Sequence, residues 1–516
     1  MSGYEPYAEI RKVGARIAFD LVDVNGTPAH LTVNSSTGLF FSQKNQVVDQ
    51  ITDMSAKWAS IETNGWMLDG TYRFISRYEN NGEVGWWSYY RSGSTKALAN
   101  STWLEVQSDV NLSTNAVTVI FDELCNQYCT DFDVTFYRHD EDSGTYSEIT
   151  TVNVTGNVSA IAIVSAQVEN YRRVRVTFKK TNNANKYVRV CEIVLGELKI
   201  FDNDEIKEIR LRYETSLFSD ALPSNEVEVT LNNVDKRYNL MNPTGIYRFL
   251  QQGQGINVSL YINGSQVNMG RFYFSSAKSA DNSLTAEITG YDRNFLLDTV
   301  LYNKGRVGQW TLAEAVADII SASGLQIETN IPADISSRTV RRDVPAQTTC
   351  REALRMVAQA AMSVCYFNRL DVLTFVSPEI GTVKDELNFD RMSAYPEAED
   401  TGLINYVELT VRSDFRNDET VYTASKVFGD EAQQTISVNN PCVANGQAVA
   451  DWILQMCGYR VSYTTNDRGN PQRELLDTIR IFDAYGNTPR AITVAEEYEL
   501  SEGLSGQTKA VTERGV

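Results

Sequence analysis

The chain contains two histidines, His30 and His139, and each lies in a polar stretch with no serine or cysteine nucleophile pattern nearby. Histidine is the usual general base at neutral pH and the usual activator of a nucleophile. A histidine-dependent mechanism is therefore not expected. The sequence also lacks a nucleophile elbow, a phosphate-binding loop, a dinucleotide fingerprint, a zinc-protease helix motif and an EF-hand loop.

Carboxylates are the next groups with catalytic chemistry, and the chain has 66 aspartates and glutamates. A glycosidase needs only two carboxylates at the right separation in space. Because accidental pairs are common among so many acids, a hydrolase is the less favoured alternative. The acidic run Asp202–Glu205 lacks the glycine and the spacing of a calcium loop, which favours a solvated turn.

Seven cysteines are scattered along the chain, an odd number that does not form a disulfide framework. Cys125 and Cys129 are the closest pair, but no second pair and no histidine accompany them. Their spacing favours buried thiols over a zinc site. We expect neither a metal nor a cofactor.

An aromatic cluster follows Gly85 in a stretch rich in glycine, asparagine and serine. Its members are Trp86, Trp87, Tyr89 and Tyr90. Exposed Trp and Tyr rings stack on the apolar face of sugars, so the cluster is a candidate saccharide site. The alternative, favoured for one or both tryptophans, is a place in a hydrophobic core. Trp66 and Trp103 lie in strand-like patterns and are expected to be core residues.

A group of basic residues stands out in an otherwise acidic chain. It comprises Arg172, Arg173, Arg175, Lys179, Lys180 and Arg189. Such a patch is a candidate docking site for an anionic cell-wall polymer or an acidic partner subunit. Cross-strand pairing with nearby aspartates and glutamates is an equally good interpretation.

The 516 residues carry a formal charge of −19, and the pI is near 4.7. An acidic surface repels DNA, which argues against wrapping of nucleic acid and suits a conduit through which DNA slides. Simple solubility explains the charge equally well. The N-terminus has no secretory signal pattern, and no apolar run reaches the ~18 residues of a membrane span. We expect synthesis in a cytoplasm and no membrane span.

These residues lie on a chain whose pattern is mostly that of β-strands. Short alternating runs between turn residues predict an all-β unit up to about residue 196. A second β-rich region covers residues 200–300, where Asn263-Gly264 is a type I′ hairpin signal. The expected strands are 15–24, 117–121, 132–137, 171–178, 187–195, 226–231, 256–262, 271–274 and 284–288.

Helices are predicted in the second half of the chain. Thr311 and Glu314 form a capping box before an apolar face of helical spacing, and Gly324 ends that helix. Thr349 and Glu352 repeat the device, and a hairpin over 364–376 follows. After strands at 406–411 and 435–438, a helix is expected over 445–457, stopped by Gly458. Strands at 460–463, 478–482 and 491–494 follow.

The segments 58–70, 85–88, 128–132 and 170–178 resemble the galactose-binding-like, discoidin-type sandwich found in tail proteins of phages of Gram-positive bacteria. The resemblance covers about residues 41–196. It implies a jelly-roll sandwich that binds either saccharide or neighbouring tail proteins.

A second resemblance is to the baseplate hub family, the N-terminal hub region of tail-associated proteins in long-tailed phages. It rests on Ser224–Asn233, the turn Gln251–Gly255 and the helix-then-hairpin 353–375. Residues 469–481 resemble the family pattern G-D-P-x-L-E-x-G-D-x-V-x-I, with Asn470 and Leu476 in place of Asp and Gly. Gly503 is expected after the final strand.

The resemblance implies a homotrimer in which each chain supplies two tube-like β-domains, so that three chains match a sixfold tail tube. We therefore expect a mainly β chain with α+β parts. Its predicted domains are a galactose-binding-like β-sandwich at 1–199, a first tube-like β-domain at 200–304, a small α/β domain at 305–380, and a second tube-like β-domain with a helix at 381–516.

The expected function is structural and non-enzymatic, in the tail tip or baseplate of a virion. The implied partners are other copies of the chain, the tail tube or distal tail protein, the tape-measure protein, other baseplate or receptor-binding proteins, and cell-wall saccharide. DNA is expected to pass without specific binding. The alternative is a carbohydrate-active surface protein, a glycoside hydrolase or lectin, with a discoidin-like module.

Overall fold

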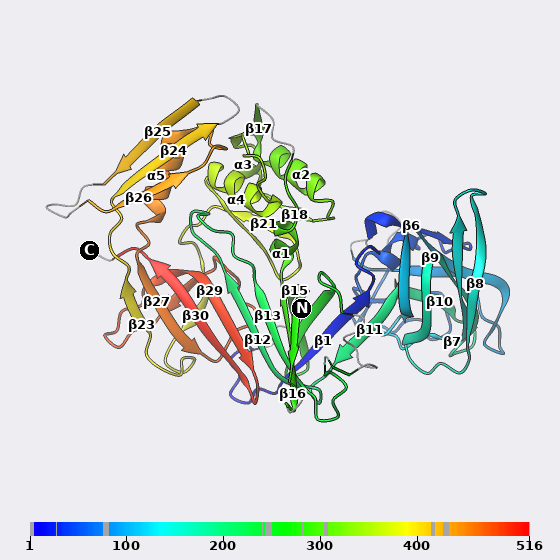
Figure 1. Cartoon of the computed structure of the whole chain (residues 1–516). Helices are drawn as coiled ribbons and strands as arrows, with labels where there is room; N and C mark the ends of the chain where they lie inside the picture. The colour runs from blue at the N-terminus through cyan, green and yellow to red at the C-terminus, as the bar shows by residue number, and fades with distance from the viewer. Residues whose placement is uncertain are drawn as a thin grey trace. The chain divides into compact units, whose positions relative to one another are not determined.

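The computed structural model describes residues 5–26, 28–75, 82–239, 241–242, 250–280, 283–303, 308–413, 418–426 and 433–514. The chain is mainly β, as predicted. It forms two compact units, seen in Figure 1. The smaller unit comprises residues 19–199 and 249–254, and the larger unit comprises 1–18, 200–248 and 255–516. The first 18 residues thus group with the larger unit, although the sequence placed them in a domain of 1–199.

The smaller unit is built on a sheet in the order β5-β10-β6-β9-β7-β8, with β2 paired to β6. Its elements are η1 (Pro28–His30), β2 (Leu31–Ser35), η2 (Lys44–Val48), β3 (Lys57–Trp58), β4 (Tyr72–Arg73), β5 (Trp86–Arg91), β6 (Ala97–Phe121), β7 (Cys129–Asp140), β8 (Thr145–Val154), β9 (Ile161–Thr181) and β10 (Tyr187–Val194). Strands β1 (Val13–Val22) and β11 (Gly196–Phe201) cross the boundary between the units.

Two long strands organise the smaller unit. The first half of β6 pairs with β2 and with the second half of β9, and its second half pairs with β10 and the first half of β9. Register shifts interrupt the β6–β9 ladder between Gln107 and Ala116, and such irregularities bend strands. Apolar residues of both halves therefore meet in one core, which contains Val106, Val119, Phe132 and Phe178.

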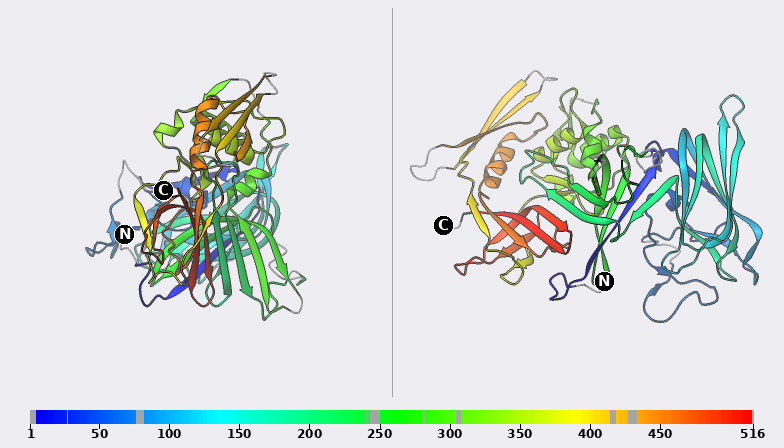
Figure 2. Two further views of the ribbon diagram at one scale, coloured as in Figure 1. Left: turned by 90° about the vertical axis from the view of Figure 1, so that its left-hand side faces the viewer. Right: turned by 60° about the horizontal axis from the view of Figure 1, so that its bottom comes forward.

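The larger unit contains a broad sheet in the order β11-β1-β14-β15-β16-β13-β12-β29-β30-β27-β23 (Figures 1 and 2). Its further strands are β12 (Ile206–Glu214), β13 (Glu226–Asn232), β14 (Gly255–Ile262), β15 (Ser265–Ser279), β16 (Thr285–Tyr291), β22 (Val383–Leu387), β23 (Glu397–Asp400), β27 (Val461–Asp467), β28 (Thr478–Ile481), β29 (Arg490–Leu500) and β30 (Leu504–Thr512). The hairpin between β14 and β15 turns at Asn263 and Gly264, with φ of 50° and 84°. The predicted type I′ signal is confirmed, since both residues have the positive φ that this turn requires.

One strand pair joins the two β-rich regions of the larger unit. Strand β12, from the region before the helices, pairs antiparallel with β29, from the region after them, in a register that runs from Ile209↔Leu500 to Glu214↔Ala495. The regions expected as separate domains at 200–304 and 381–516 therefore share one continuous sheet.

Strand β30 follows Gly503, where no strand is predicted from the sequence. Its residues Leu504–Thr512 alternate between buried and exposed positions in the pattern BeBeBeBiB. Serine, glycine, threonine and alanine fill most of these positions, so the alternation is hidden from a search for large apolar side chains. Pairing with β27 and β29 on both sides fixes the strand.

A group of helices and short strands packs against one another in the larger unit. It contains α1 (Arg293–Asp298), β17 (Gln309–Thr311), α2 (Leu312–Ser323), β18 (Thr329–Asn330), α3 (Ala333–Ser336), β19 (Thr339–Arg341), α4 (Cys350–Ala360), β20 (Val364–Phe367) and β21 (Leu373–Val376). Helix α2 has the predicted reciprocal capping box between Thr311 and Glu314, and Gly324 ends it with φ 71°. Thr349 caps α4, but the Glu352 carboxylate binds Arg355 instead of closing a second box.

Residues after 381 contribute to the same helical group, which corrects the predicted division at 380. Strands β24 (Tyr406–Ser413), β25 (Asp418–Ser425) and β26 (Thr435–Asn439) form a separate small sheet that packs on α5 (Gly446–Met456). Leu409, Val449 and Ile453 share one apolar core with Leu354 and Val357 of α4. Residues 406–456 are therefore an insertion into the second β-rich region that joins the helices.

Candidate functional site: the polar face of the sheet and the clusters that hold it

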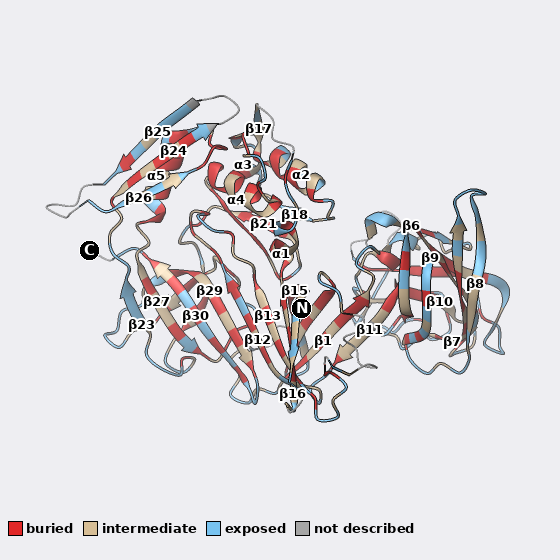
Figure 3. Cartoon of the chain, viewed as in Figure 1, coloured by how far each residue is buried: buried red, intermediate tan, exposed pale blue. Residues whose placement is uncertain are grey.

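One face of the broad sheet is polar across several adjacent strands, and we call it the polar sheet face. Along each strand, the residues of this face alternate with buried apolar residues that point to the opposite face. Ile209, Val229 and Ile288 are examples of the buried residues, and they pair with one another across adjacent strands. Figure 3 shows this alternation along β12, β13, β29 and β30. The charged members of the polar sheet face are Glu208, Arg210, Arg212, Glu214, Glu226, Glu228, Lys278, Glu287, Glu497, Glu499 and Lys509.

The polar sheet face is acidic, with seven glutamates against two arginines and two lysines in this set. Arg212 lies 3.2 Å from Glu226 and 3.6 Å from Glu497, so it bridges three strands. Arg210 pairs with Glu208 at 2.6 Å. Among the described residues, Glu214 and Glu228 form no ion pair. The polar sheet face therefore carries an excess of negative charge.

A buried charge cluster centred on Arg473 holds the second β-rich region together. The Arg473 guanidinium is fully buried and contacts Asp385 at 3.1 Å and Asp467 at 3.0 Å. It also donates to Glu496 of β29 and to the Thr508 hydroxyl of β30. One side chain thus connects strands β22, β27, β29 and β30.

The N-terminal segment is attached to the same cluster. The Tyr7 hydroxyl donates to Asp385 at 2.5 Å, and burial raises its pKa far above the usual range. Arg11 donates to the carbonyl oxygens of Arg468, Gly469 and Leu504. In return Arg468 donates to the carbonyl of Ala8 at 2.7 Å. These contacts explain why the first residues group with the larger unit.

The loop 469–477 carries the pattern that the sequence resembles. Leu476, which stands where the pattern has glycine, has φ 68°, the left-handed conformation that glycine adopts most easily. Asn470, which stands for Asp, donates to Asp385 at 3.0 Å. Arg473 is a third departure, since it stands where the pattern has leucine. The position of the pattern's glycine has a left-handed backbone conformation in this chain, and the position of its leucine holds the buried charge of Arg473.

The predicted aromatic cluster divides into two parts. Trp86 and Trp87 are 1% and 0% exposed and belong to the core, so these two do not present a face to a sugar. Tyr89 and Tyr90 are 51% and 48% exposed, with ring centroids 5.0 Å apart. The first three residues of β5 are buried and the last three are exposed, so the tryptophans and the tyrosines lie in different environments.

Two other tryptophans differ from expectation. Trp66 is 43% exposed and lies 6.2 Å from the ring of Phe74, which is 77% exposed. Trp103 is half-buried. The guanidinium carbon of Arg175 lies over its ring, 4.6 Å from the ring centroid of Trp103. Trp66 lies in a loop rather than a strand, so the strand-like pattern around it was misleading.

The predicted basic patch is neutralised by carboxylates. Arg175 lies 2.6 Å from Glu105, Lys179 lies 2.6 Å from Asp133, and Arg172 lies 2.7 Å from Glu141. Arg173 stacks on Tyr146 at 3.8 Å and also faces Glu105, and Lys180 lies 3.8 Å from Asp131. Cross-strand pairing is therefore the interpretation that this geometry supports.

Arg189, the last member of the basic group, is a core residue. It is 2% exposed, stacks on Trp87 at 3.8 Å, and binds Glu62 and Asp122, the latter at 2.7 Å. It is unavailable to any external anion. Sequence spacing could not separate it from Lys179, since both are basic residues on strands.

The remaining chemical candidates are dispersed. All seven cysteines are free, and burial raises the pKa of the Cys125 thiol to about 11. His30 lies 2.8 Å from Asp109 on the surface. Within the described ranges, no group of three His, Cys, Asp or Glu residues is arranged to hold a metal ion. The backbone carbonyl oxygen of Asp202 accepts from the Glu205 N–H at 2.9 Å, as expected of a turn.

None of the helices in the described part of the chain has the length and apolar character needed to cross a membrane.

No protein-family model matches the sequence, and no curated protein matches it. Several solved structures are similar in fold. They include a 43 kDa tail protein of prophage MuSo2 from Shewanella oneidensis, with 14% identity, TM-score 0.45, and coverage of 61% of this chain and 94% of that one. A tail protein from Neisseria meningitidis MC58 has 12% identity, TM-score 0.44 and coverage of 61% and 94%. Prophage tail protein gp18 from Listeria monocytogenes has 13% identity, TM-score 0.42 and coverage of 62% and 92%.

Proposed function

We propose that this chain is a non-enzymatic structural protein of a phage tail, a baseplate or tail-tip hub that assembles as a homotrimer around a lumen. The observation that carries the proposal is the β12–β29 ladder, which joins two β-rich regions of one chain into a single sheet. Two such regions per chain give six in a trimer, the number needed to face a sixfold tail tube. The resemblance of residues 224–233 and 469–481 to hub proteins agrees with this arrangement.

A ring of sheets needs free strand edges through which copies can pair. Among the described residues, β23 ends the sheet, and all four of its residues are exposed. An unpaired edge is a ready template for a strand of another subunit. In the proposed trimer the neighbouring chain covers this edge, which otherwise leaves backbone groups of the sheet exposed to water.

The polar sheet face forms the wall of the lumen in this proposal. Its excess of glutamates repels the phosphates of DNA, so DNA passes without adhesion. The buried apolar face of the same sheet lies outward against the rest of the subunit. The expected partners are the tail tube or distal tail protein, the tape-measure protein, and other baseplate or receptor-binding proteins of the virion.

The smaller unit acts as an accessory binding domain of galactose-binding-like type. Its exposed Tyr89 and Tyr90 remain the candidates for stacking on a cell-wall saccharide. Because the basic group is paired with carboxylates, docking of an anionic polymer through it is not part of the proposal. The second proposed role of the smaller unit is to bind neighbouring tail proteins.

Light scattering coupled to size exclusion of the full chain tests the hub. The expected result is a trimer, alone or with the tail-tube protein, and particles with threefold symmetry in negative-stain images. A chain that stays strictly monomeric with its tail partners overturns the proposal. Hydrolysis of peptidoglycan or of a soluble glycan by the purified chain contradicts the non-enzymatic part.

A further inference from the structure

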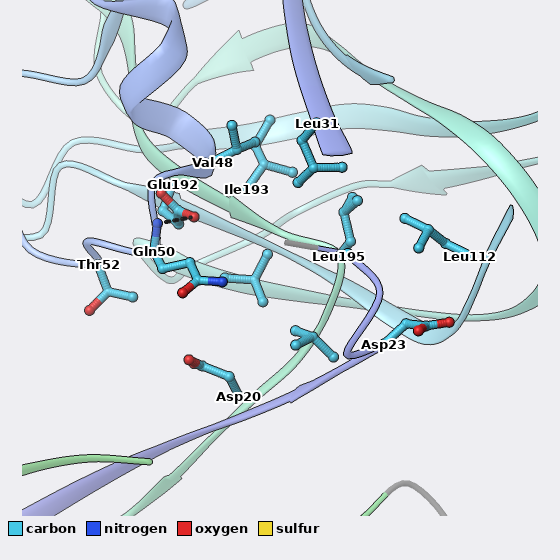
Figure 4. Close-up of a pocket in the computed structure, with 13 residues that line it drawn as sticks. Asp20, Asp23, Leu31, Val48, Gln50, Thr52, Leu112, Glu192, Ile193 and Leu195 are labelled. Atoms are coloured by element: carbon cyan, nitrogen blue, oxygen red, sulfur yellow. Dashed lines mark hydrogen bonds between the residues drawn. The ribbon is translucent and has the colours of Figure 1, made fainter. Parts of the chain in front are cut away.

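A pocket in the smaller unit has features that the hub function does not use. It is an open hollow lined by thirteen residues. Strand β1, the loop after η2, and strand β10 supply its polar side, and Leu31, Leu112 and Leu195 supply apolar walls (Figure 4). A concave site with apolar walls and a few convergent polar groups is the usual form of a small-ligand site.

Glu192 is the unusual member of the lining. Its side chain is 2% exposed, and one carboxyl oxygen accepts from the backbone N–H of Gln50 at 3.2 Å. The other oxygen, Oε2, has no hydrogen-bond partner among the described residues. A buried carboxyl oxygen without a partner destabilises the folded state, because it has lost its hydrogen bonds to water and gained none in the protein. The presence of this oxygen beside a pocket is explained if a bound ligand donates a hydrogen bond to it.

The charged side chains that act most strongly on Glu192 are acidic. Asp20 and Asp23 also line the pocket, and none of the thirteen described lining residues is basic. Asp49 and Glu83 act on Glu192 electrostatically, together with Asp20. Burial, followed by the Asp49 charge, raises the pKa of Glu192 well above its usual range. A cation bound in the pocket would favour the ionised form of Glu192. It would offset both the cost of burying that charge and the repulsion from the other acidic side chains.

The geometry indicates what kind of cation fits. No group of His, Cys, Asp and Glu within the described ranges is arranged to ligate a metal ion, and three leucines form a wall that a bare ion does not use. A methylene stem packs on such a wall while its charged end reaches the carboxyl group. We propose that this pocket binds a primary alkylammonium group, such as the side chain of a lysine from a partner protein, with Glu192 as its counter-ion.

Binding of the ammonium requires Glu192 as a carboxylate, so a proton leaves Glu192 when the cation enters. Affinity is therefore expected to rise with pH. Asp20, Asp49 and Glu83 act on Glu192 electrostatically. Burial raises the pKa of Asp49 and of Glu83, so the ionisation of either one at higher pH strengthens the attraction for the cation.

Titration of the full-length chain with n-butylammonium chloride, followed by calorimetry or ligand-observed NMR, tests the site. Butanol, which has the same stem without the charge, is the control ligand. We expect saturable millimolar binding of butylammonium that is at least tenfold tighter than that of butanol and is lost in Glu192→Gln. Asp109→Asn, which removes an exposed acid of the same unit, is expected to leave binding unchanged.

A second variant keeps the test decisive if Glu192→Gln misfolds. Thr52→Lys places an ammonium at the pocket lining and is expected to block the probe. Nα-acetyl-lysine amide distinguishes the source: tighter binding than butylammonium supports a partner's lysine, and weaker binding supports a free amine. Equal affinity for butanol, or unchanged binding in both Glu192→Gln and Thr52→Lys, overturns the ammonium site.

Discussion

The guanidinium of Arg473 and the carboxylate of Glu496 form a two-point contact inside the larger unit, with Nε–Oε1 at 2.6 Å and Nη2–Oε2 at 3.0 Å. Parallel hydrogen bonds of this type fix orientation as well as charge. Glu496 lies on β29, the strand that pairs with β12. The contact therefore orders the strand that joins the two β-rich regions.

We predict that Arg473→Leu destabilises the larger unit by about 3–5 kcal/mol, because it leaves Asp467 and Glu496 buried without their cation. Urea denaturation followed by far-UV circular dichroism measures the loss. Arg480→Leu is the matched control, since Arg480 and its partner Glu386 are 39% and 43% exposed. Its cost is expected below about 1 kcal/mol. Equal costs for the two variants would show that the cluster adds nothing to an ordinary surface pair.

The stability of the smaller unit is predicted to fall as pH rises. Burial, with the Asp49 charge next, raises the pKa of Glu83 to about 9, while a glutamate in the unfolded chain titrates near ~4.3. Between these values the folded state keeps a proton that the unfolded state has lost, so the free energy of unfolding declines with pH. Asp49 and Glu192 face the same cluster and add to the decline.

Glu83→Gln separates this effect from general alkaline instability. The variant is expected to flatten the decline between pH 5 and pH 9 and to stabilise the unit by about 2 kcal/mol at pH 8, the scale of an unsatisfied buried group. Urea titrations monitored by tryptophan fluorescence measure both quantities. Glu123→Gln, at an exposed position, should keep the wild-type slope. A Glu83→Gln slope identical to wild type would refute the assignment.

A glycine substitution in the loop 469–477 tests its backbone shape. Leu476 has φ 68°, whereas its neighbour Leu475 is 6% exposed and has no positive φ. We predict that Leu476→Gly changes stability by less than about 1 kcal/mol, since relief of the left-handed conformation offsets lost packing. Leu475→Gly should cost about 3 kcal/mol or more. Chemical denaturation of the two variants measures the loss of unfolding free energy in each. A larger loss for Leu476→Gly than for Leu475→Gly contradicts the prediction.

Local signals in the sequence predicted local structure well. The cap at Thr311, the stop at Gly324 and the turn at Asn263-Gly264 were all confirmed, because each depends on residues within a few positions of one another. Strand β30 was missed because its inward positions are small or polar. The insertion of residues 406–456 into the helical group was missed because its cause is packing on residues far away in sequence.

Site residues were harder to predict because residue type does not reveal which face of a strand is buried. Arg189 and Lys179 look alike in sequence, yet Arg189 is a core residue and Lys179 lies half-exposed beside Asp133. Trp66 looked like a core residue and is exposed. The pocket beside Glu192 could not be predicted from the sequence, since its acidic residues come from segments that are far apart in the chain.

Arg189 and Lys179 also provide a matched pair of variants for the smaller unit. We predict that Arg189→Met costs about 3–5 kcal/mol, because Glu62 and Asp122 lose their buried partner. Lys179→Met removes a surface pair with Asp133 and is expected to cost less than about 1 kcal/mol. Thermal unfolding followed by near-UV circular dichroism compares them. A mild effect at Arg189 would mean that the buried charges are not needed for the fold.

Reversal of charge on the polar sheet face tests its proposed role as a lumen wall. We predict that Glu214→Lys combined with Glu228→Lys gives the chain a salt-sensitive affinity for duplex DNA that wild type lacks, because the face then carries more basic than acidic groups. Fluorescence anisotropy of a labelled duplex at 50 and 200 mM salt measures it, with weaker binding at the higher salt as counterion release requires. Glu123→Lys with Asp142→Lys makes the same charge change at exposed positions of the smaller unit. Equal DNA binding by both double variants would assign the effect to net charge alone and remove the polar sheet face from the argument.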